Sequence, residues 1–167
     1  MKSLSSLLVD STKFDNIQKL DYGTNNDIFI GNNLLQKKQN LIKYFKFDLN
    51  ILTNQKLFFD EVEMSRKIES PFFAKMTGFS LSFFNPEDKQ YYPAILYEKI
   101  PSFQFKDAFR NQQNSKTFTS TQKSIIAFKI LVSLESIYNK EDINYCFRSD
   151  SIYLTSDRIP ILFYEGT

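Results

Sequence analysis

The chain has 167 residues, of which 42% are hydrophobic and 24% are charged, and its 21 basic residues nearly balance its 19 acidic ones. This length suits one domain with a sizeable core, and the net charge of +2 argues against a nucleic-acid interface built on bulk charge. The absence of histidine and the presence of one cysteine, Cys146, exclude histidine-based catalysis, histidine metal ligands and an intrachain disulfide. No apolar stretch approaches the ~18–20 residues of a membrane span. We therefore expect a cytoplasmic protein that binds neither nucleic acid nor membrane.

The spacing of apolar and turn-forming residues predicts a leader followed by strands and helices. Residues 1–16 are expected to form a polar leader with one short helical turn. Five strands are predicted where short apolar runs end in turn residues, at 17–20, 27–30, 41–45, 74–83 and 92–97. Three helices are predicted at 55–69, 104–112 and 119–138, and two short strands close the chain at 151–154 and 159–163.

Two of these helices have apolar faces that predict burial. In the helix over 55–69, the expected buried face consists of Leu57, Phe58, Val62, Ser65 and Ile68. In the helix over 119–138, apolar residues cover most of the circumference and predict deep burial: Ile125, Ile126, Phe128, Ile130, Leu131, Leu134 and Ile137. Thr119 or Ser120 is expected to cap this helix.

Three segments near the end of the chain have the spacing of motifs in the protein kinase family. Asn144-Tyr145-Cys146, Ser151-Ile152-Tyr153-Leu154 and Tyr164-Glu165-Gly166 resemble the family's His-Arg-Asp, Asn-Ile-Leu-Leu and Asp-Phe-Gly. In kinases the first Asp positions the substrate hydroxyl, and the Asn and the second Asp hold magnesium. The matching positions here are Cys146, Ser151 and Tyr164, and none of them is a carboxylate. The resemblance therefore implies a kinase-like chain without catalytic residues and without a metal site.

Matches to the nucleotide-binding part of the family precede these motifs in the same order. The glycine-rich loop matches Asp21, Gly23, Asn26 and Ile28, so one of its three glycines remains. A glycine lets the backbone approach phosphates closely, which the substituted positions oppose. Pro93-Ala94-Ile95-Leu96-Tyr97-Glu98-Lys99-Ile100-Pro101 resembles strand five and the hinge. This match puts Tyr97 at the gatekeeper position and the backbone of Glu98 and Ile100 at the adenine edge.

A lysine and a glutamate complete the resemblance. Leu41-Ile42-Lys43 is similar to the family's Ala-Ile-Lys, so Lys43 is the candidate phosphate lysine. Its expected partner is Glu61 on the following helix, and Glu63 is the competing carboxylate. The alternative is an ordinary strand lysine near a solvated helix carboxylate.

The resemblance covers about residues 17–167 and implies an α+β fold of the protein kinase type. Residues 17–100 would form a five-stranded antiparallel small lobe with one helix, and residues 101–167 a truncated large lobe of two helices and a short hairpin. It implies a pseudokinase that acts by protein binding or allostery and requires no cofactor. ATP binding at best would be weak, at Gly23, Ile28, Lys43, Glu61, Tyr97, Glu98 and Ile100.

Two other interpretations stay open. One is a weakly active or atypical kinase, in which Asp142, Asp150 or Glu165 replaces the lost ligands. The other is a truncated kinase remnant that needs a partner or downstream sequence. In each case we expect a protein partner or a second copy of the chain to cover the last long helix, whose uncovered side is expected at Ile126 and Ile130.

Overall fold

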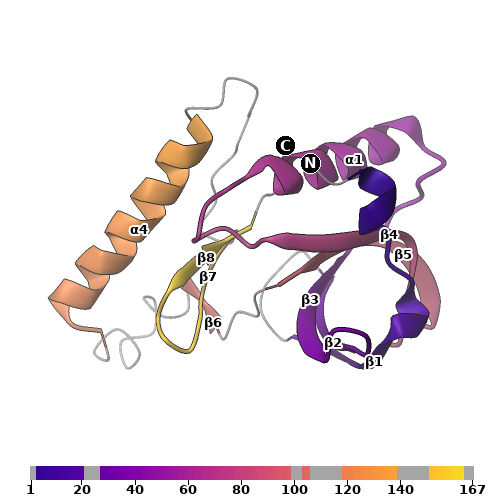
Figure 1. Ribbon diagram of the computed structural model, residues 1–167, viewed down its shortest axis with the longest axis horizontal. Coiled ribbons are helices and arrows are strands. Elements are labelled where there is room, and N and C mark those ends of the chain that lie inside the picture. Colours follow the sequence, from indigo (N-terminus) through magenta and orange to yellow (C-terminus); the bar gives the residue numbers. More distant parts are fainter. Residues whose placement is uncertain (1–2, 21–26, 99–102, 106–117, 139–150, 164–167) are drawn as a thin grey trace. The chain divides into compact units, whose positions relative to one another are not determined.

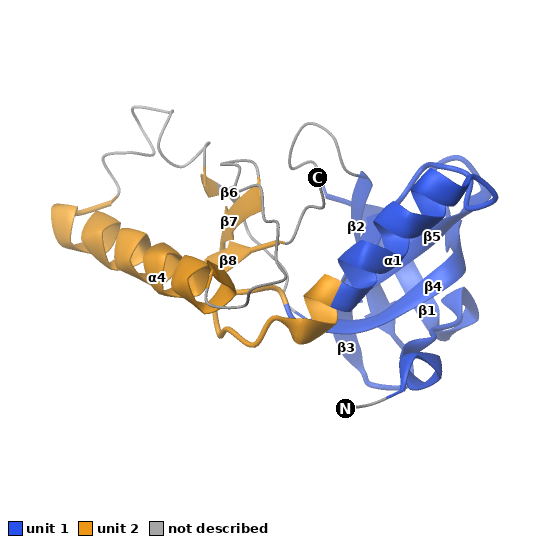
Figure 2. Cartoon of the chain, turned by 90° about the horizontal axis from the view of Figure 1, so that it is seen from above, with its two compact units in different colours: residues 1–63, 75–100 blue, residues 64–74, 101–167 orange. Residues whose placement is uncertain are grey.

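The computed structural model describes residues 3–20, 27–98, 103–105, 118–138 and 151–163. Within them the chain is a mixed α/β protein with a five-stranded antiparallel sheet and two α-helices (Figure 1). It forms two compact units (Figure 2). Unit 1 contains residues 1–63 and 75–100, and unit 2 contains residues 64–74 and 101–167. No helix in the described ranges has the length and apolar character needed to cross a membrane.

The sheet of unit 1 is built from five strands, each of which overlaps a predicted apolar run. They are β1 (Phe14–Lys19), β2 (Asp27–Asn33), β3 (Lys38–Tyr44), β4 (Met76–Asn85) and β5 (Gln90–Tyr97). The strand order is β1-β2-β3-β5-β4, and every neighbouring pair is antiparallel. The rings of Phe14 and Phe83 lie 5.3 Å apart although β1 and β4 are the two edge strands. The sheet therefore curls strongly, and its concave face encloses a core of Phe14, Phe29, Ile42, Tyr44, Phe83, Ala94 and Leu96.

Helix α1 (Leu52–Lys67) runs across the other face of the sheet (Figure 1). It begins three residues before the predicted start and ends ahead of Pro71, as expected. Phe58, Val62 and Ser65 are buried, as predicted. The prediction for Leu57 is wrong, because this side chain is exposed. Adjacent helix positions differ by about 100°, so a face centred on Phe58 and Val62 turns Leu57 outward.

The N-terminal segment lies along the edge strand β4. Two short 3₁₀ turns, Leu4–Leu7 and Ser11–Lys13, stand where one helical turn is predicted. Between them the Val9 amide donates a hydrogen bond of 2.9 Å to the Phe79 carbonyl. A Cβ atom on Gly78 would lie 2.4 Å from Val9 Cγ2, so glycine permits this close approach. The predicted leader to residue 16 is too long, since β1 already begins at Phe14.

Five charged side chains form an ion-pair network at one end of the sheet. Lys19 lies 3.2 Å from Asp27 and 2.8 Å from Glu87, and Lys46 lies 2.6 Å from Asp27 and 3.5 Å from Asp88. Partial burial of the Asp27 carboxyl acts to raise its pKa, but the hydrogen bonds from Lys46 and Lys19 outweigh burial and lower this pKa below its usual value. The pKa of Asp88 is also lowered, since hydrogen bonds, including one from Lys46, outweigh its desolvation.

This network predicts a loss of stability in acid. A carboxyl whose pKa is lower in the folded state stabilises the fold above its unfolded pKa, and this contribution disappears as the pH falls through the folded value. We expect the urea concentration at the midpoint of unfolding to decrease once the pH is below about 4, since the ordinary pKa of both aspartates is 3.8. The double variant Asp27→Asn, Asp88→Asn should show a flatter acid limb, measured by urea unfolding between about pH 3 and pH 7. An unchanged acid limb would contradict the assignment, and Asp15→Asn, at an exposed position of β1, is the matched control.

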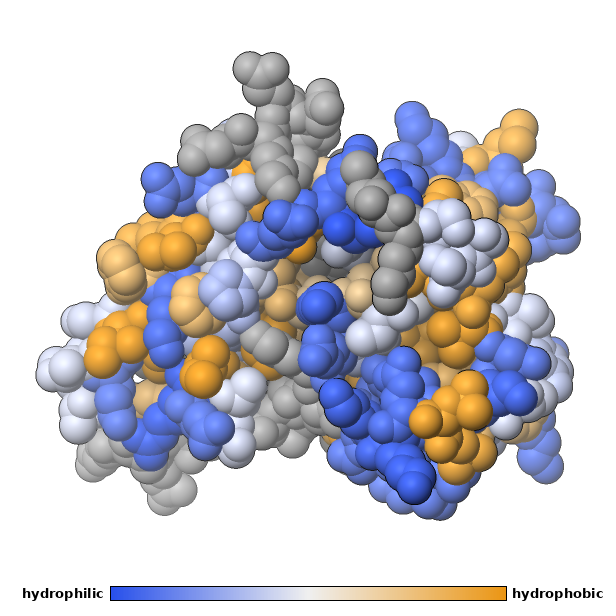
Figure 3. Space-filling model, in the orientation of Figure 1, coloured by the Kyte–Doolittle hydropathy of each residue, from blue (hydrophilic) through white to orange (hydrophobic). Residues whose placement is uncertain are grey.

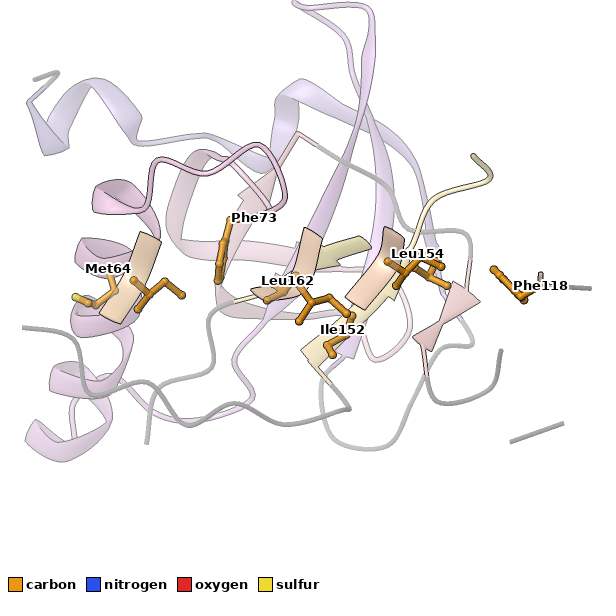
Figure 4. Packing of buried hydrophobic residues seen from close by; sticks show 9 residues of the cluster. Met64, Phe73, Phe118, Ile152, Leu154 and Leu162 are labelled. Carbon is orange, nitrogen blue, oxygen red and sulfur yellow. The ribbon is translucent and has the colours of Figure 1, made fainter. Parts of the chain in front are cut away.

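Unit 2 combines one long helix with a small antiparallel sheet. Helix α4 spans Ser120–Tyr138, and strands β6 (Phe103–Gln104), β7 (Ile152–Leu154) and β8 (Pro160–Leu162) pair in that order. The core consists of Met64, Phe73, Phe118, Ile126, Ile130, Ile137, Ile152, Leu154 and Leu162 (Figure 4). Thr119 caps α4, since its hydroxyl accepts from the Gln122 amide at 3.2 Å while the Gln122 side chain accepts from the Thr119 amide at 3.0 Å. Gln104 belongs to β6, not to a helix, and residues 106–112 of that predicted helix lie outside the described residues.

The orientation of α4 corrects the expectation of burial all round. Its buried side chains are Ile126, Ile130, Ser133 and Ile137, whereas large apolar side chains are exposed at Ile125, Phe128, Leu131 and Tyr138. The side expected to be uncovered, Ile126 and Ile130, therefore faces the core, because the small sheet packs on that side. Figure 3 shows hydrophobic surface over α4 on the face turned toward the viewer. We call Ile125, Phe128, Leu131 and Tyr138 the outer face of α4.

Candidate functional site

A buried ion pair joins the middle of the sheet of unit 1 to its helix. Lys43 Nζ lies 2.6 Å from Glu61 Oε1, and each side chain is only 5% exposed. The partner that the sequence predicts for Lys43 is thus present, and it is Glu61, not Glu63. A charged pair at this depth is expensive to desolvate, so it persists only where the geometry of the two charges is good.

Aromatic side chains surround this pair. The Lys43 ammonium lies 5.1 Å from the centroid of the Phe45 ring, and Phe45 packs edge-on against Phe58 at 5.2 Å. The Tyr97 hydroxyl donates a long hydrogen bond of 3.4 Å to the same Glu61 oxygen that Lys43 contacts. Because water is excluded here, the attraction between the two charges is stronger than it would be at the surface.

The strand register fixes where the other predicted binding residues lie. Ile28 on β2 is directly opposite Lys43 and is buried. Tyr97 is opposite Leu41, two residues along β3 from Lys43, where the pairing between β3 and β5 ends. Glu98 is exposed, and its amide donates a hydrogen bond of 2.9 Å to the Lys75 carbonyl. Gly23 and Ile100 lie outside the described residues.

A buried amide that was not predicted from the sequence supports this site. The Asn40 side chain donates to the Tyr97 carbonyl at 3.2 Å and to the Thr77 hydroxyl at 3.1 Å. It thereby ties β3 to the residue at which β5 ends and to strand β4. The available signal was an asparagine directly before the apolar pair Leu41-Ile42, since an amide that is buried with such a strand must find hydrogen-bond partners.

Of the three positions that match catalytic motifs, the structure describes only Ser151. It is fully buried, and its hydroxyl has no hydrogen-bond partner among the described residues. Its carbonyl accepts a hydrogen bond of 3.0 Å from the Phe163 amide, which joins β7 to the end of β8. Cys146 and Tyr164 lie outside the described residues, as do the possible substitutes Asp142, Asp150 and Glu165.

Within the described part of the chain, no group of three or more cysteine, aspartate or glutamate side chains is arranged to hold a metal ion. A comparison with protein-family models found no match, and neither did a search of curated proteins. What this site can do chemically must therefore be inferred from its own side chains. The Lys43 ammonium is held by the Glu61 carboxylate and by aromatic rings, and its charge is already balanced at a distance of 2.6 Å.

Proposed function

We propose that the chain is a pseudokinase-like protein that binds other proteins and does not transfer phosphate. The observation that carries this proposal is the buried Lys43–Glu61 pair between β3 and α1. The order of three strands, a helix and two further strands in unit 1 is also similar to the small lobe of a protein kinase. Cys146, Ser151 and Tyr164 cannot supply the carboxylates that kinase chemistry requires.

Any nucleotide binding is proposed to be weak and independent of metal. Lys43 can meet one phosphate, but Glu61 already neutralises its charge at 2.6 Å. The buried Tyr97 ring fills space at the position of the gatekeeper, and its hydrogen bond to Glu61 holds the ring there. No cofactor is therefore required for the proposed role.

Phosphoryl transfer tests the proposal directly. We expect no incorporation of radiolabelled phosphate into the chain or into generic protein substrates with magnesium or manganese, because the groups that position the nucleotide and neutralise its charge are replaced together. Incorporation that disappears in the Asp150→Ala variant would contradict the proposal and favour an atypical kinase. The matched control is Asp157→Ala, which changes an exposed aspartate in the β7–β8 turn.

A thermal-shift titration tests the nucleotide. A ligand at a hundredfold excess over its Kd stabilises the folded state by about 2.7 kcal/mol. We expect far less with ATP at millimolar concentration, with or without magnesium, and a further reduction in the Lys43→Met variant. A large shift that requires magnesium would show that a metal-dependent nucleotide site exists.

The outer face of α4 supports binding to a protein. Three of its residues, Ile125, Phe128 and Leu131, lie at spacings of three along one side of the helix, and Phe128 is 67% exposed. Exposed apolar surface of this kind marks interaction sites or aggregation hazards. A partner protein or a second copy of the chain is the proposed occupant.

A further inference from the structure

Unit 1 contains a groove that is separate from the Lys43–Glu61 pair. Its volume is about 480 Å³, within the range of ligand-binding sites. One wall is the connection between β3 and α1, and the other is formed by β4 and β5. The lining residues are Lys46, Phe47, Asp48, Leu49, Asn50, Leu81, Tyr91, Tyr92 and Pro93.

Local hydrogen bonds hold the connection in one conformation. The Asp48 carboxylate accepts from the Asn50 amide at 2.8 Å, and its carbonyl accepts from the Asn54 side chain at 3.0 Å. The Phe45 amide donates to the Pro93 carbonyl at 2.9 Å, which fixes the start of the connection to β5. A wall formed in advance lowers the entropy that a ligand loses on binding.

The groove exposes apolar side chains, although the Tyr91 ring also packs against Phe84 at 5.4 Å and the Phe47 ring against Phe45 at 5.5 Å. Tyr91 is 61% exposed and Leu81 is 45% exposed. Ile51 at the end of the connection and Leu52 at the start of α1 are exposed as well. Phe47 and Leu49 are half-buried and extend the same apolar lining.

Carboxylates outnumber ammonium groups around this apolar lining. Lys46 is already neutralised by Asp27 at 2.6 Å and Asp88 at 3.5 Å, and Glu87 lies at 3.8 Å. Asp48, which lines the groove, makes no ion pair with any residue that the structure describes. The charged groups of this region are four carboxylates and three lysines: Asp27, Asp48, Glu87, Asp88, Lys19, Lys46 and Lys89. The carboxylates therefore exceed the lysines by one charge, and a negative excess favours cationic partners.

We infer that this groove is a docking site for an extended peptide segment of a partner protein that carries large apolar side chains next to lysine or arginine. The apolar side chains would pack between Leu81 and Tyr91. The flanking basic residue would reach the Asp48 carboxylate. The inference goes beyond the proposed function, because it depends neither on nucleotide binding nor on the outer face of α4.

The test is a titration of the whole ¹⁵N-labelled chain with three hexapeptides, followed by NMR. The probes are Arg-Lys-Leu-Phe-Lys-Arg, its acidic counterpart Glu-Glu-Leu-Phe-Glu-Glu, and Arg-Lys-Ser-Ser-Lys-Arg, which lacks the apolar pair. We expect saturable shifts of Phe47, Asn50, Leu81 and Tyr91 with the first peptide at sub-millimolar concentration. The other two peptides should bind at least about tenfold more weakly, a difference of about 1.4 kcal/mol.

Variants at the groove and away from it sharpen this test. Leu81→Asp should weaken the first peptide about tenfold, and Asp48→Asn should weaken it while retaining the hydrogen bond from the Asn50 amide. Leu35→Asp is the matched control, since Leu35 is an exposed leucine (74%) in the turn between β2 and β3, and it should leave binding unchanged. Equal binding of the acidic peptide, shifts elsewhere on the chain, or no saturation at millimolar concentration would overturn the inference. So would groove shifts that depend only on protein concentration, which would assign the groove to a second copy.

Discussion

Replacing Glu61 by glutamine is expected to lower the free energy of unfolding by about 3–5 kcal/mol, the cost of breaking a buried ion pair. The change keeps the size of the side chain but leaves the Lys43 ammonium, whose side chain is 5% exposed, without the carboxylate at 2.6 Å. The lost energy is mainly the desolvation of an ammonium that no opposite charge then compensates. Urea unfolding followed by circular dichroism measures the effect.

Two further variants separate this explanation from a general loss of packing. In the double variant Lys43→Met, Glu61→Leu both charges are removed together, and much of the stability should return because the surrounding aromatic rings can pack against apolar side chains. Asp60→Asn changes an exposed carboxylate on the same helix and should cost less than about 0.5 kcal/mol. If Glu61→Gln unfolds at the wild-type urea concentration, the pair is accessible to water and the description of a dry site is wrong.

Two substitutions on α4 should separate its role in folding from its role in association. Ile126→Glu places a carboxylate in the core of unit 2, where Ile126 is 2% exposed, and should destabilise the protein by at least about 3 kcal/mol. Phe128→Glu lies on the outer face of α4 and should change stability by about 0.5 kcal/mol or less. The same change should reduce concentration-dependent association, which sedimentation velocity measures.

The pair of variants decides how α4 is covered. Association that persists in Phe128→Glu would place the contact elsewhere on the chain. A stable monomer at high wild-type concentration would show that the outer face binds a different protein or none. Unfolding by Phe128→Glu would show that this side of the helix is core, contrary to its exposure.

The strands of unit 1 could be predicted because short apolar runs end in turn residues, which is typical of strands that are buried on both faces. On β3, for example, Ile42 and Tyr44 belong to the concave core, while Lys43 faces α1. The contact between Lys43 and Glu61 was predicted only from the resemblance to kinases, because the residues alone are equally typical of an ordinary strand lysine and a solvated helix carboxylate. The resemblance to kinases supplied the choice between Glu61 and Glu63, which spacing alone did not make.

The orientation of α4 could not be predicted in the same way. Its apolar residues surround the helix, so the sequence pattern carries no preferred direction. Only the position of β7 and β8 decides that Ile126 is buried and Phe128 is exposed. The groove could not be predicted from the sequence either. It depends on the conformation of the connection between β3 and α1, whose residues have no periodic pattern.

The close contact between Val9 and Gly78 has a practical consequence for anyone who shortens the chain. Strand β4 is the last strand of its sheet, and the N-terminal segment occupies part of its outer edge through the Val9–Phe79 hydrogen bond. A fragment that starts at β1 would leave those backbone groups open to pairing with strands of other molecules. Recombinant forms that keep residues 3–13 should therefore stay dispersed at concentrations where the shorter fragment precipitates.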